Sequence, residues 1–391
     1  MNRINKIAQD RRVQKALADF DGRIPQITDL TIAIQQIPAP TFHEAERAAF
    51  IQAQFEALGL QDVSQDELHN VYGRYPASPH PLTLSLPHPV IISAHSDTVF
   101  PAGTDLTVRR NGRTIHGPGI GDNSAGVAGI LTLARTLLEY DLQCPVDVWF
   151  VANVGEEGLG DLRGMRRVVE RFGGEAAYIV VEGGLYGQIS HRGIGVQRYR
   201  IQVETPGGHS WGNFRQPSAI HVLGRLITAL DELPAPRQPK TTYNVGVIEG
   251  GTSINTIAQE ASLLLDLRSE DSAALEDLVA EVEMLVKRFD RPPEVRVTME
   301  MIGNRPAGGI PADTPLVQWA EAALRFVGRP YPHFITSSTD ANIPLSLGYT
   351  AVCVGLAESS NAHRLDEYLD TQYLSAGMSQ LLLLTLAAAG Y

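Results

Sequence analysis

The sequence predicts an α/β protein in which a second, smaller domain interrupts the first. β-rich runs at 89–93, 146–154 and 177–181 alternate with helical stretches, and the order of elements changes after residue 195. Strands that alternate with helices are typical of an α/β sheet. We therefore expect a discontinuous first domain over 1–195 and 309–391, with an inserted domain over 196–308.

The helices of the first domain are predicted from caps and from apolar spacing. Thr41 and Glu44 are three residues apart, a capping-box signature that opens a helix running to about Leu58. Apolar residues at helical spacing over 125–140 indicate a largely buried helix. After the insertion, helix, strand and helix are expected over 314–327, 350–354 and 370–389.

The inserted segment has its own pattern. Tyr199, Ile201 and Val203 alternate as in a strand. A helix over 218–233, strands near 242–249 and 260–268, a helix over 275–289 and a strand over 295–301 follow. This β-α-β-β-α-β order predicts a ferredoxin-like unit.

Composition excludes several classes of protein. Apolar residues make up 43% and charged residues 19% of the 391 positions, as in globular proteins that bury a core. Lys and Arg number 32 against 44 Asp and Glu, and no block of basic residues occurs, so we expect no nucleic-acid partner. The two cysteines, Cys144 and Cys353, predict no disulfide framework.

No feature of the sequence predicts export or a membrane span. The first twenty residues contain basic side chains but no continuous apolar stretch, so we expect no secretory signal and a cytoplasmic protein. The longest apolar run, 381–389, is far shorter than the roughly 20 residues that cross a bilayer, and it predicts a buried terminal helix.

Potential metal ligands follow the ends of the predicted strands. His95 and Asp97, two positions apart, project to the same side of an extended segment. A metal-bound imidazole usually gives its second N–H to a carboxylate or a carbonyl, so Asp97 is expected to support His95. Asp122 lies in a glycine-dense turn before the 125–140 helix, where a helix N-cap is the alternative interpretation.

Two further strand ends carry carboxylates. Glu156 and Glu157 are adjacent between glycines, and Glu182 closes the next strand. Adjacent carboxylates repel unless a cation or a proton compensates, although a solvated acidic turn is the alternative. Because ligands of open α/β sheets bind beyond the carboxyl ends of strands, these junctions predict one site. Carboxylates together with imidazole suit zinc, cobalt or manganese.

At these residues the chain resembles metallopeptidase family M-twenty, which includes peptidase T, glutamate carboxypeptidase, aminoacylase, acetylornithine deacetylase and succinyl-diaminopimelate desuccinylase. The resemblance covers nearly the whole length and preserves the order of the motifs. These motifs are His95-Ser96-Asp97, Gly121-Asp122-Asn123, Glu156-Glu157, Val181-Glu182-Gly183, Gly207-Gly208-His209-Ser210, Gly250-Gly251-Thr252-Ser253-Ile254-Asn255 and His363 through Glu367.

The resemblance implies a zinc-exopeptidase-like catalytic domain that holds two divalent metal ions. Zn²⁺ is the expected metal, with Co²⁺ or Mn²⁺ as alternatives. Asp122 would bridge both ions, His95 and Glu182 would complete one site, and Glu157 and His363 would complete the other.

The resemblance also assigns the catalytic roles. Glu156 would be the general base, Asp97 would orient a metal-bound imidazole, and His209 would stabilise the oxyanion in the active site of a partner subunit. It implies that the inserted domain is a lid and mediates a homodimer. Asn255 and Arg305 match positions that contact substrate, with an ordinary surface arginine as the alternative for Arg305.

The substrate class is the part that the motifs leave open. Within the family that the chain resembles, Glu at position 182 accompanies carboxypeptidases and deacylases, which implies a peptide or an N-acyl amino acid as substrate, and Arg305 suits a substrate carboxylate. The turns around Asp122 and His209 also resemble peptidase T, so a di- or tripeptide aminopeptidase is the alternative. Ser124 replaces a lysine common in relatives without removing a ligand. A non-catalytic scaffold or binding protein that retains the fold is the hypothesis from another class.

Overall fold

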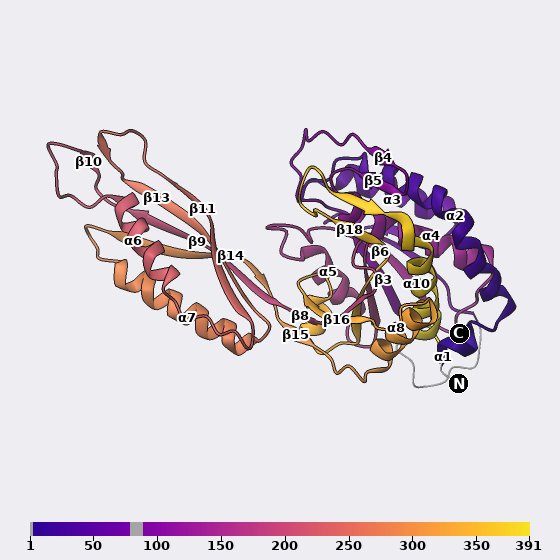
Figure 1. Ribbon diagram of the computed structural model, residues 1–391. Coiled ribbons are helices and arrows are strands. Elements are labelled where there is room, and N and C mark those ends of the chain that lie inside the picture. Colours follow the sequence, from indigo (N-terminus) through magenta and orange to yellow (C-terminus); the bar gives the residue numbers. More distant parts are fainter. Residues whose placement is uncertain (1–2, 79–88) are drawn as a thin grey trace. The chain divides into compact units, whose positions relative to one another are not determined.

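The computed structural model describes residues 3–78 and 89–391, and the chain divides into two compact units (Figure 1). Unit 1 comprises Met1–Gly193 and Gly309–Tyr391, and unit 2 comprises Ile194–Gly308. Each unit has a hydrophobic core of its own. The roles expected for them, a catalytic domain and a lid or dimerisation domain, remain predictions.

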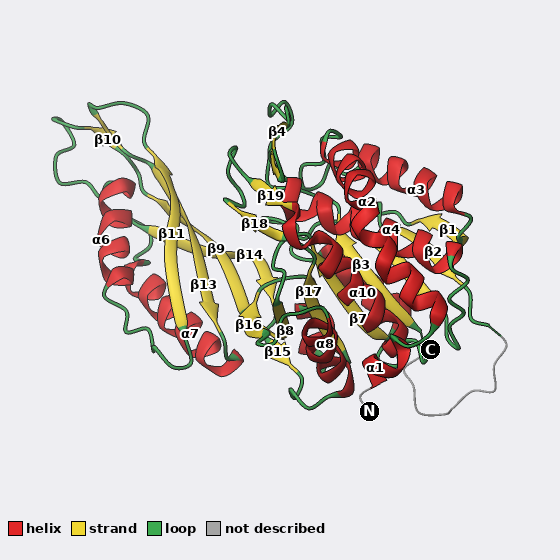
Figure 2. Cartoon of the chain, turned by 45° about the vertical axis from the view of Figure 1, so that its right-hand side comes forward, coloured by secondary structure: helices red, strands yellow, loops and turns green. Residues whose placement is uncertain are grey.

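Within the described residues, a nine-stranded mixed sheet forms the centre of unit 1 (Figure 2). The middle strands β6, β3, β7 and β17 are parallel and consist mostly of buried apolar side chains, as is typical of parallel sheets. The order is β1-β2-β6-β3-β7-β17-β8-β15, with β16 paired to β8. The strands are β1 (Gln61–Gln65), β2 (Val71–Tyr75), β3 (Val90–His95), β6 (Val148–Asn153), β7 (Ala177–Glu182), β8 (Gln188–Gly193), β15 (Gly308–Gly309), β16 (His333–Ser337) and β17 (Ala351–Gly355).

Helices pack against this sheet and against one another. α4 contacts β3 and β7, α5 contacts β6, and α8 contacts β17. In the described part of the chain, no helix combines the length and the apolar character that a bilayer crossing requires. The helices of unit 1 are α1 (Arg3–Ile7), α2 (Arg11–Gln35), α3 (Ala45–Leu58), α4 (Ala125–Glu139), α5 (Arg163–Phe172), α8 (Pro315–Phe326), α9 (Asn342–Ser346) and α10 (Leu374–Ala388).

A small antiparallel sheet and two short turns complete unit 1. The sheet has the order β18-β19-β5-β4. The turn η1 precedes α4 directly and carries one of the predicted ligands. The elements are β4 (Arg109–Asn111), β5 (Thr114–His116), η1 (Ile120–Ser124), β18 (Glu358–Ser360), β19 (Tyr368–Asp370) and η2 (Thr371–Tyr373).

Unit 2 has the predicted β-α-β-β-α-β order. Its antiparallel sheet runs β11-β13-β9-β14, and α6 and α7 pack together on it (Figure 1). Side chains of β9 and β13 alternate between buried and more exposed positions, because one face lies against the helices. The elements are β9 (Gly195–Glu204), β10 (Gly208–His209), α6 (Ala219–Asp231), β11 (Thr241–Gly250), β12 (Thr256–Ile257), β13 (Glu260–Ser269), α7 (Ser272–Phe289) and β14 (Arg296–Arg305).

The α/β class is confirmed, but one local prediction is wrong. α3 ends at Leu58 as expected, yet it begins at Ala45 with Glu44 as its N-cap, and Glu44 makes no side-chain capping bond. Thr41 Oγ1 instead donates to Asp97 at 2.8 Å, and the Glu44 carboxylate pairs with Arg163 at 2.8 Å. The two side chains of the expected capping box therefore support the loops that carry the site.

Candidate metal centre

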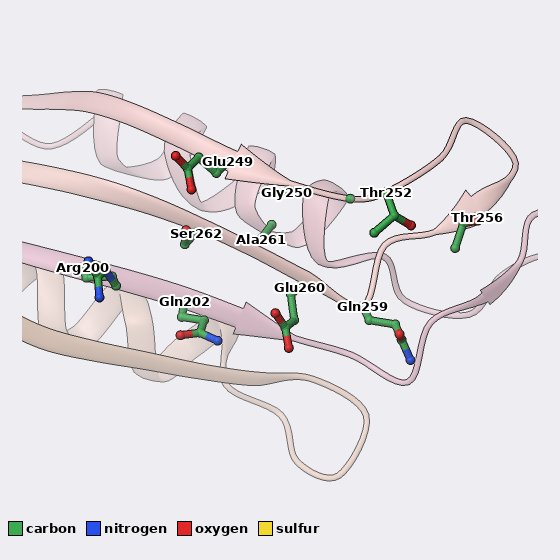
Figure 3. Close-up of a pocket in the computed structure, with 11 residues that line it drawn as sticks. Arg200, Gln202, Glu249, Gly250, Thr252, Thr256, Gln259, Glu260, Ala261 and Ser262 are labelled. Atoms are coloured by element: carbon green, nitrogen blue, oxygen red, sulfur yellow. The ribbon is translucent and has the colours of Figure 1, made fainter.

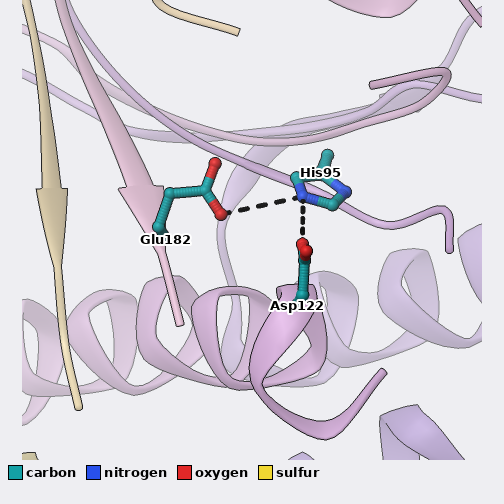
Figure 4. Close-up of side chains that lie close together, drawn as sticks. All are labelled: His95, Asp122 and Glu182. Carbon is teal, nitrogen blue, oxygen red and sulfur yellow. Dashed lines mark ion pairs between the residues drawn. The ribbon is translucent and has the colours of Figure 1, made fainter. Parts of the chain in front are cut away.

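One group of candidate ligands lies at the carboxyl edge of the unit 1 sheet (Figure 4). His95 ends β3, Glu182 ends β7, and Asp122 lies in η1. Because β3 and β7 are adjacent and parallel, their ends lie at the same edge. His95 Nε2 is 3.1 Å from Asp122 Oδ1 and 3.7 Å from Glu182 Oε2. One nitrogen and two carboxylate oxygens thus converge on one point.

A second group shares a residue with the first. His363 Nε2 lies 3.2 Å from Asp122 Oδ2 and 3.2 Å from Glu157 Oε1. Asp122 therefore directs one oxygen at His95 and the other at His363. Two clusters that share one carboxylate fit a pair of neighbouring cations.

The two groups differ in burial. His95 is 1% exposed at the end of a central strand, whereas the His363 side chain is 54% exposed. His363 lies in the loop between β18 and β19 and has a left-handed backbone with φ 66°. The first group is therefore embedded in the sheet edge, and the second opens to solvent.

The donor set suits divalent transition metals. Two imidazole nitrogens and several carboxylates are the ligands that zinc, cobalt and manganese accept. Glu157 Oε1 is buried and makes no hydrogen bond among the described residues, although it lies 3.2 Å from His363 Nε2. A buried acceptor in this state is costly unless a cation or a donor satisfies it. The side chains present therefore fit a bound ion.

The electrostatics favour positive charge at both imidazoles. The carboxylates of Asp122 and Glu157, each 3.2 Å from His363 Nε2, raise the pKa of His363 to about 10. Burial lowers the pKa of His95, but its carboxylate partners outweigh burial and raise that pKa well above the usual value. Burial, together with the negative charge of Asp122, raises the pKa of Glu157 and of Glu182. A divalent cation would neutralise this concentration of carboxylates directly.

Asp97 organises the backbone that carries the acidic pair. Its two carboxylate oxygens accept the N–H groups of Glu156 and Glu157, each at 3.0 Å, and the hydroxyl of Thr41 at 2.8 Å. His95 Nδ1 is 3.2 Å from the Asp97 carbonyl oxygen and 3.5 Å from its carboxylate. The imidazole thus has a partner on Asp97, and the nearer atom is the carbonyl.

Glu156 lies with the ligands but outside the groups that contain Asp122. It is 6% exposed, and its carboxylate can approach a common point with His95 and Glu157. Glu156 thus lies near the candidate ligands but is not part of either group that contains Asp122. A general base beside a metal pair needs such a position, near the metals but not bound to them.

Sequence reasoning missed how the Asp122 turn is held. The Glu367 carboxylate accepts the N–H groups of Gly119 and Gly121 at 2.8 Å and that of Asp122 at 2.9 Å. Glycine density indicated that something approaches this backbone, but no local signal identified an acceptor 245 positions away. Burial raises the pKa of Glu367 to about 7.

Asn123 is the second residue whose role was missed. Its Oδ1 accepts the N–H of Gly126 at 3.1 Å and of Gly183 at 2.7 Å, and its Nδ2 donates to Val181 O at 2.9 Å. It therefore ties the Asp122 turn to the end of β7. The N-cap alternative for Asp122 fails, because Ser124 occupies the position before α4.

His209, in unit 2, presents a defined tautomer. Its Nδ1 accepts the N–H groups of Trp211 at 3.2 Å and of Gly212 at 3.3 Å. A neutral imidazole whose Nδ1 is an acceptor carries its proton on Nε2. The side chain is exposed, so an N–H donor is offered to solvent or to a ligand.

The two predicted substrate contacts lie apart. Asn255 is beside His209, since its carbonyl accepts the N–H of Ser210 at 3.0 Å. Arg305 pairs in register with Val196 at the start of β9, so it lies at the opposite end of that strand from His209. Arg305 is 5% exposed, and the surface-arginine alternative is therefore wrong.

A hollow of about 620 Å³ lies on the sheet of unit 2 (Figure 3). Its walls include charged side chains of β9, β11 and β13, among them Arg200, Glu249 and Glu260. No residue predicted as a ligand or a catalytic group lines it. The candidate metal ligands lie at the sheet edge of unit 1, not at this hollow.

Comparisons with known proteins match most of the chain. The model of the peptidase family M20/M25/M40 matches residues 91–386. An acetylornithine deacetylase of Klebsiella pneumoniae is 27% identical over 73% of this chain and 76% of its own length. A putative succinyl-diaminopimelate desuccinylase of Mycobacterium tuberculosis is 26% identical over 90% of this chain and 96% of its own length.

Solved structures share the fold. A tripeptidase from Staphylococcus aureus has a TM-score of 0.76 at 21% identity, covering 94% of this chain and 99% of that chain. A di-peptidase from Saccharomyces cerevisiae has a TM-score of 0.77 at 15% identity, covering 97% of this chain and 99% of that chain. At these identities the likeness concerns the fold alone.

Proposed function

The chain belongs to peptidase family M20/M25/M40, and on that premise we propose that it hydrolyses an amide bond in a small peptide or an N-acyl amino acid with two zinc ions. Membership makes it a hydrolase of amide bonds; the metal and the substrate are our proposal. The observation that carries it is the Asp122 carboxylate, which directs one oxygen at each of two imidazoles. Co²⁺ and Mn²⁺ are the alternative ions.

Glu156 is the residue that moves the proton. Metal ions held by His95, Asp122, Glu157, Glu182 and His363 would lower the pKa of a water and polarise the scissile carbonyl. Glu156 takes a proton from that water and delivers it to the departing amine, because its carboxylate lies beside His95 and Glu157. The hydrogen bond from Glu156 N to Asp97 holds this backbone in place.

His209 supplies the donor for the oxyanion. Its Nε2–H is fixed by the two backbone donors at Nδ1 and points away from them. A preorganised donor of this kind stabilises the negative charge that develops on the carbonyl oxygen. By the family resemblance, unit 2 mediates a homodimer in which His209 serves the partner's site.

Arg305 and Glu182 favour a substrate with a free carboxylate, whereas a peptidase T-like aminopeptidase is the second candidate. We expect Arg305→Lys to raise KM on the order of tenfold for N-acyl amino acids, because lysine lacks the planar two-pronged donor. Substrates with an amidated C-terminus serve as the control. Equal KM changes for both substrate types would favour the aminopeptidase.

The first experiment separates an enzyme from a scaffold that retains the fold. Metal content per chain is measured, and hydrolysis of dipeptides, tripeptides and N-acyl amino acids is compared before and after chelation. We expect about two zinc equivalents per chain and hydrolysis that chelation abolishes and zinc restores. A chain that binds no metal and hydrolyses nothing on the panel would favour the scaffold.

A further inference from the structure

A buried acid and a buried amide meet at the end of β6, beside the strand end that carries His95. Asp340 precedes α9, and Asn153 is the last residue of β6. Both side chains are completely buried. Asn153 Nδ2 donates to Asp340 Oδ2 at 2.6 Å. Neither residue belongs to a candidate metal group among the described residues.

The hydrogen bond between Asn153 and Asp340 uses only one oxygen of the acid and none of the amide. Asp340 Oδ1 and Asn153 Oδ1 are buried and make no hydrogen bond within the part of the chain that the structure describes. Each of these oxygens would be satisfied by a donor, and a carboxyl group supplies a donor only when it is protonated. A protonated Asp340 has that donor, and burial raises the pKa of Asp340 to about 7. In that state the Asp340 O–H is a donor that the Asn153 amide oxygen can accept, while the amide nitrogen already donates to Asp340 Oδ2.

The pair is connected to the site through the backbone. Asn153 is the register partner of His95 across β6 and β3. Its carbonyl accepts both the N–H of Ser96 at 2.7 Å and the Ser96 hydroxyl at 3.0 Å. Three residues further along the chain is Glu156. A shift of Asn153 would therefore move a metal ligand and the proposed base together.

The burial of the pair argues against simple space filling. Apolar side chains would fill the same volume without leaving acceptors unsatisfied, and unsatisfied buried acceptors cost free energy. Asp340 is hydrogen-bonded to Asn153, which lies opposite His95 in the sheet. Polar groups that support metal ligands from behind tune both metal affinity and activity.

We propose that Asp340 and Asn153 form a positioning pair that fixes the ends of β3 and β6, and thereby His95 and Glu156. The assignment of His95 as a metal ligand and Glu156 as the base rests on the proposed function. The pair touches neither substrate nor metal; it acts through the residues it holds.

The test measures zinc affinity of the full chain by competition with a chelating dye, together with kcat and KM. We expect Asp340→Ala to weaken zinc binding about tenfold or more and to lower kcat with little change in KM. Asp340→Asn is expected to stay within about threefold of the wild type, because two facing amides still exchange two hydrogen bonds. The exchanged pair, Asn153→Asp with Asp340→Asn, should recover most of the affinity that Asn153→Ala loses.

Leu382→Ala provides the matched control. Leu382 is fully buried in α10, so its truncation lowers thermal stability without touching the pair. If Asp340→Ala binds zinc like the wild type while its Tm falls as in Leu382→Ala, the residue only fills the core and the proposal is overturned. Equal losses in Asp340→Ala and Asp340→Asn would also overturn it, since charge would then be the cause.

The result that would contradict the proposed function differs from the results that would contradict the positioning pair. A wild-type chain that binds zinc but hydrolyses no substrate would refute the hydrolase, while the affinity comparison would still decide the role of the pair. A wild-type chain that binds no zinc would overturn both.

Discussion

The two units place their polar chemistry in different ways. In unit 1, β3 and β7 are buried along their length, and their candidate ligands are the terminal residues His95 and Glu182. In unit 2, β9 alternates between buried and more exposed positions, and His209 lies beyond the strand in an exposed loop.

The difference follows from strand direction. Parallel strands bring all their carboxyl ends to one edge, so ligands that are distant in sequence converge there. The negative charges of their carboxylates then repel one another unless a cation lies between them. An antiparallel sheet alternates its ends, and loops at either end carry isolated groups. Unit 1 therefore gathers a charged cluster, whereas unit 2 offers single donors such as the His209 Nε2–H.

The largest expected effect tests the chemistry of unit 1. Glu156→Gln removes the proton acceptor while preserving shape, so we expect kcat to fall by roughly 10²–10⁴-fold with zinc content unchanged. Steady-state kinetics and metal analysis check this, and Glu276→Gln on the exposed face of α7 is the control. Unchanged hydrolysis with zinc still bound would show that another group moves the proton.

The next effect tests whether unit 2 takes part in the reaction. His209→Ala removes the fixed Nε2–H, and we expect kcat to fall by about 10²–10³-fold without loss of zinc. His221, exposed on α6 in the same unit, is the matched control and its alanine variant should behave like the wild type. If both variants keep full activity, unit 2 contributes no donor to catalysis.

The smallest effect distinguishes the two ligand groups of unit 1. Because the His363 side is open to solvent and the His95 side is embedded, we expect a chelator to remove zinc in two phases, the His363 side first. His363→Ala should retain about one equivalent of zinc and lack the fast phase. A single phase in the wild type would indicate that the two groups hold metal equally.

Periodicity was enough to predict most elements of both units. The runs at 89–93 and 177–181 became β3 and β7, and the 125–140 helix became α4, because their apolar patterns are strong and local. The capping box failed, since Thr41 and Glu44 are engaged by Asp97 and Arg163 instead. Asp97 and Arg163 are distant from these residues in the sequence, so the local sequence pattern does not predict the contacts.

The sequence by itself determined the α/β class, the β-α-β-β-α-β order of the insertion and the residue types at the strand ends, because these depend on local spacing. The family resemblance implied that Asp122 joins the two groups, and only the tertiary structure decided which of its oxygens faces His95 and which faces His363, that Glu367 holds the Asp122 turn, and that Asp340 meets Asn153. Those contacts join residues more than a hundred positions apart or set the direction of single carboxylate oxygens. The packing of strands and loops in space, and not the pattern along the chain, fixes such relations.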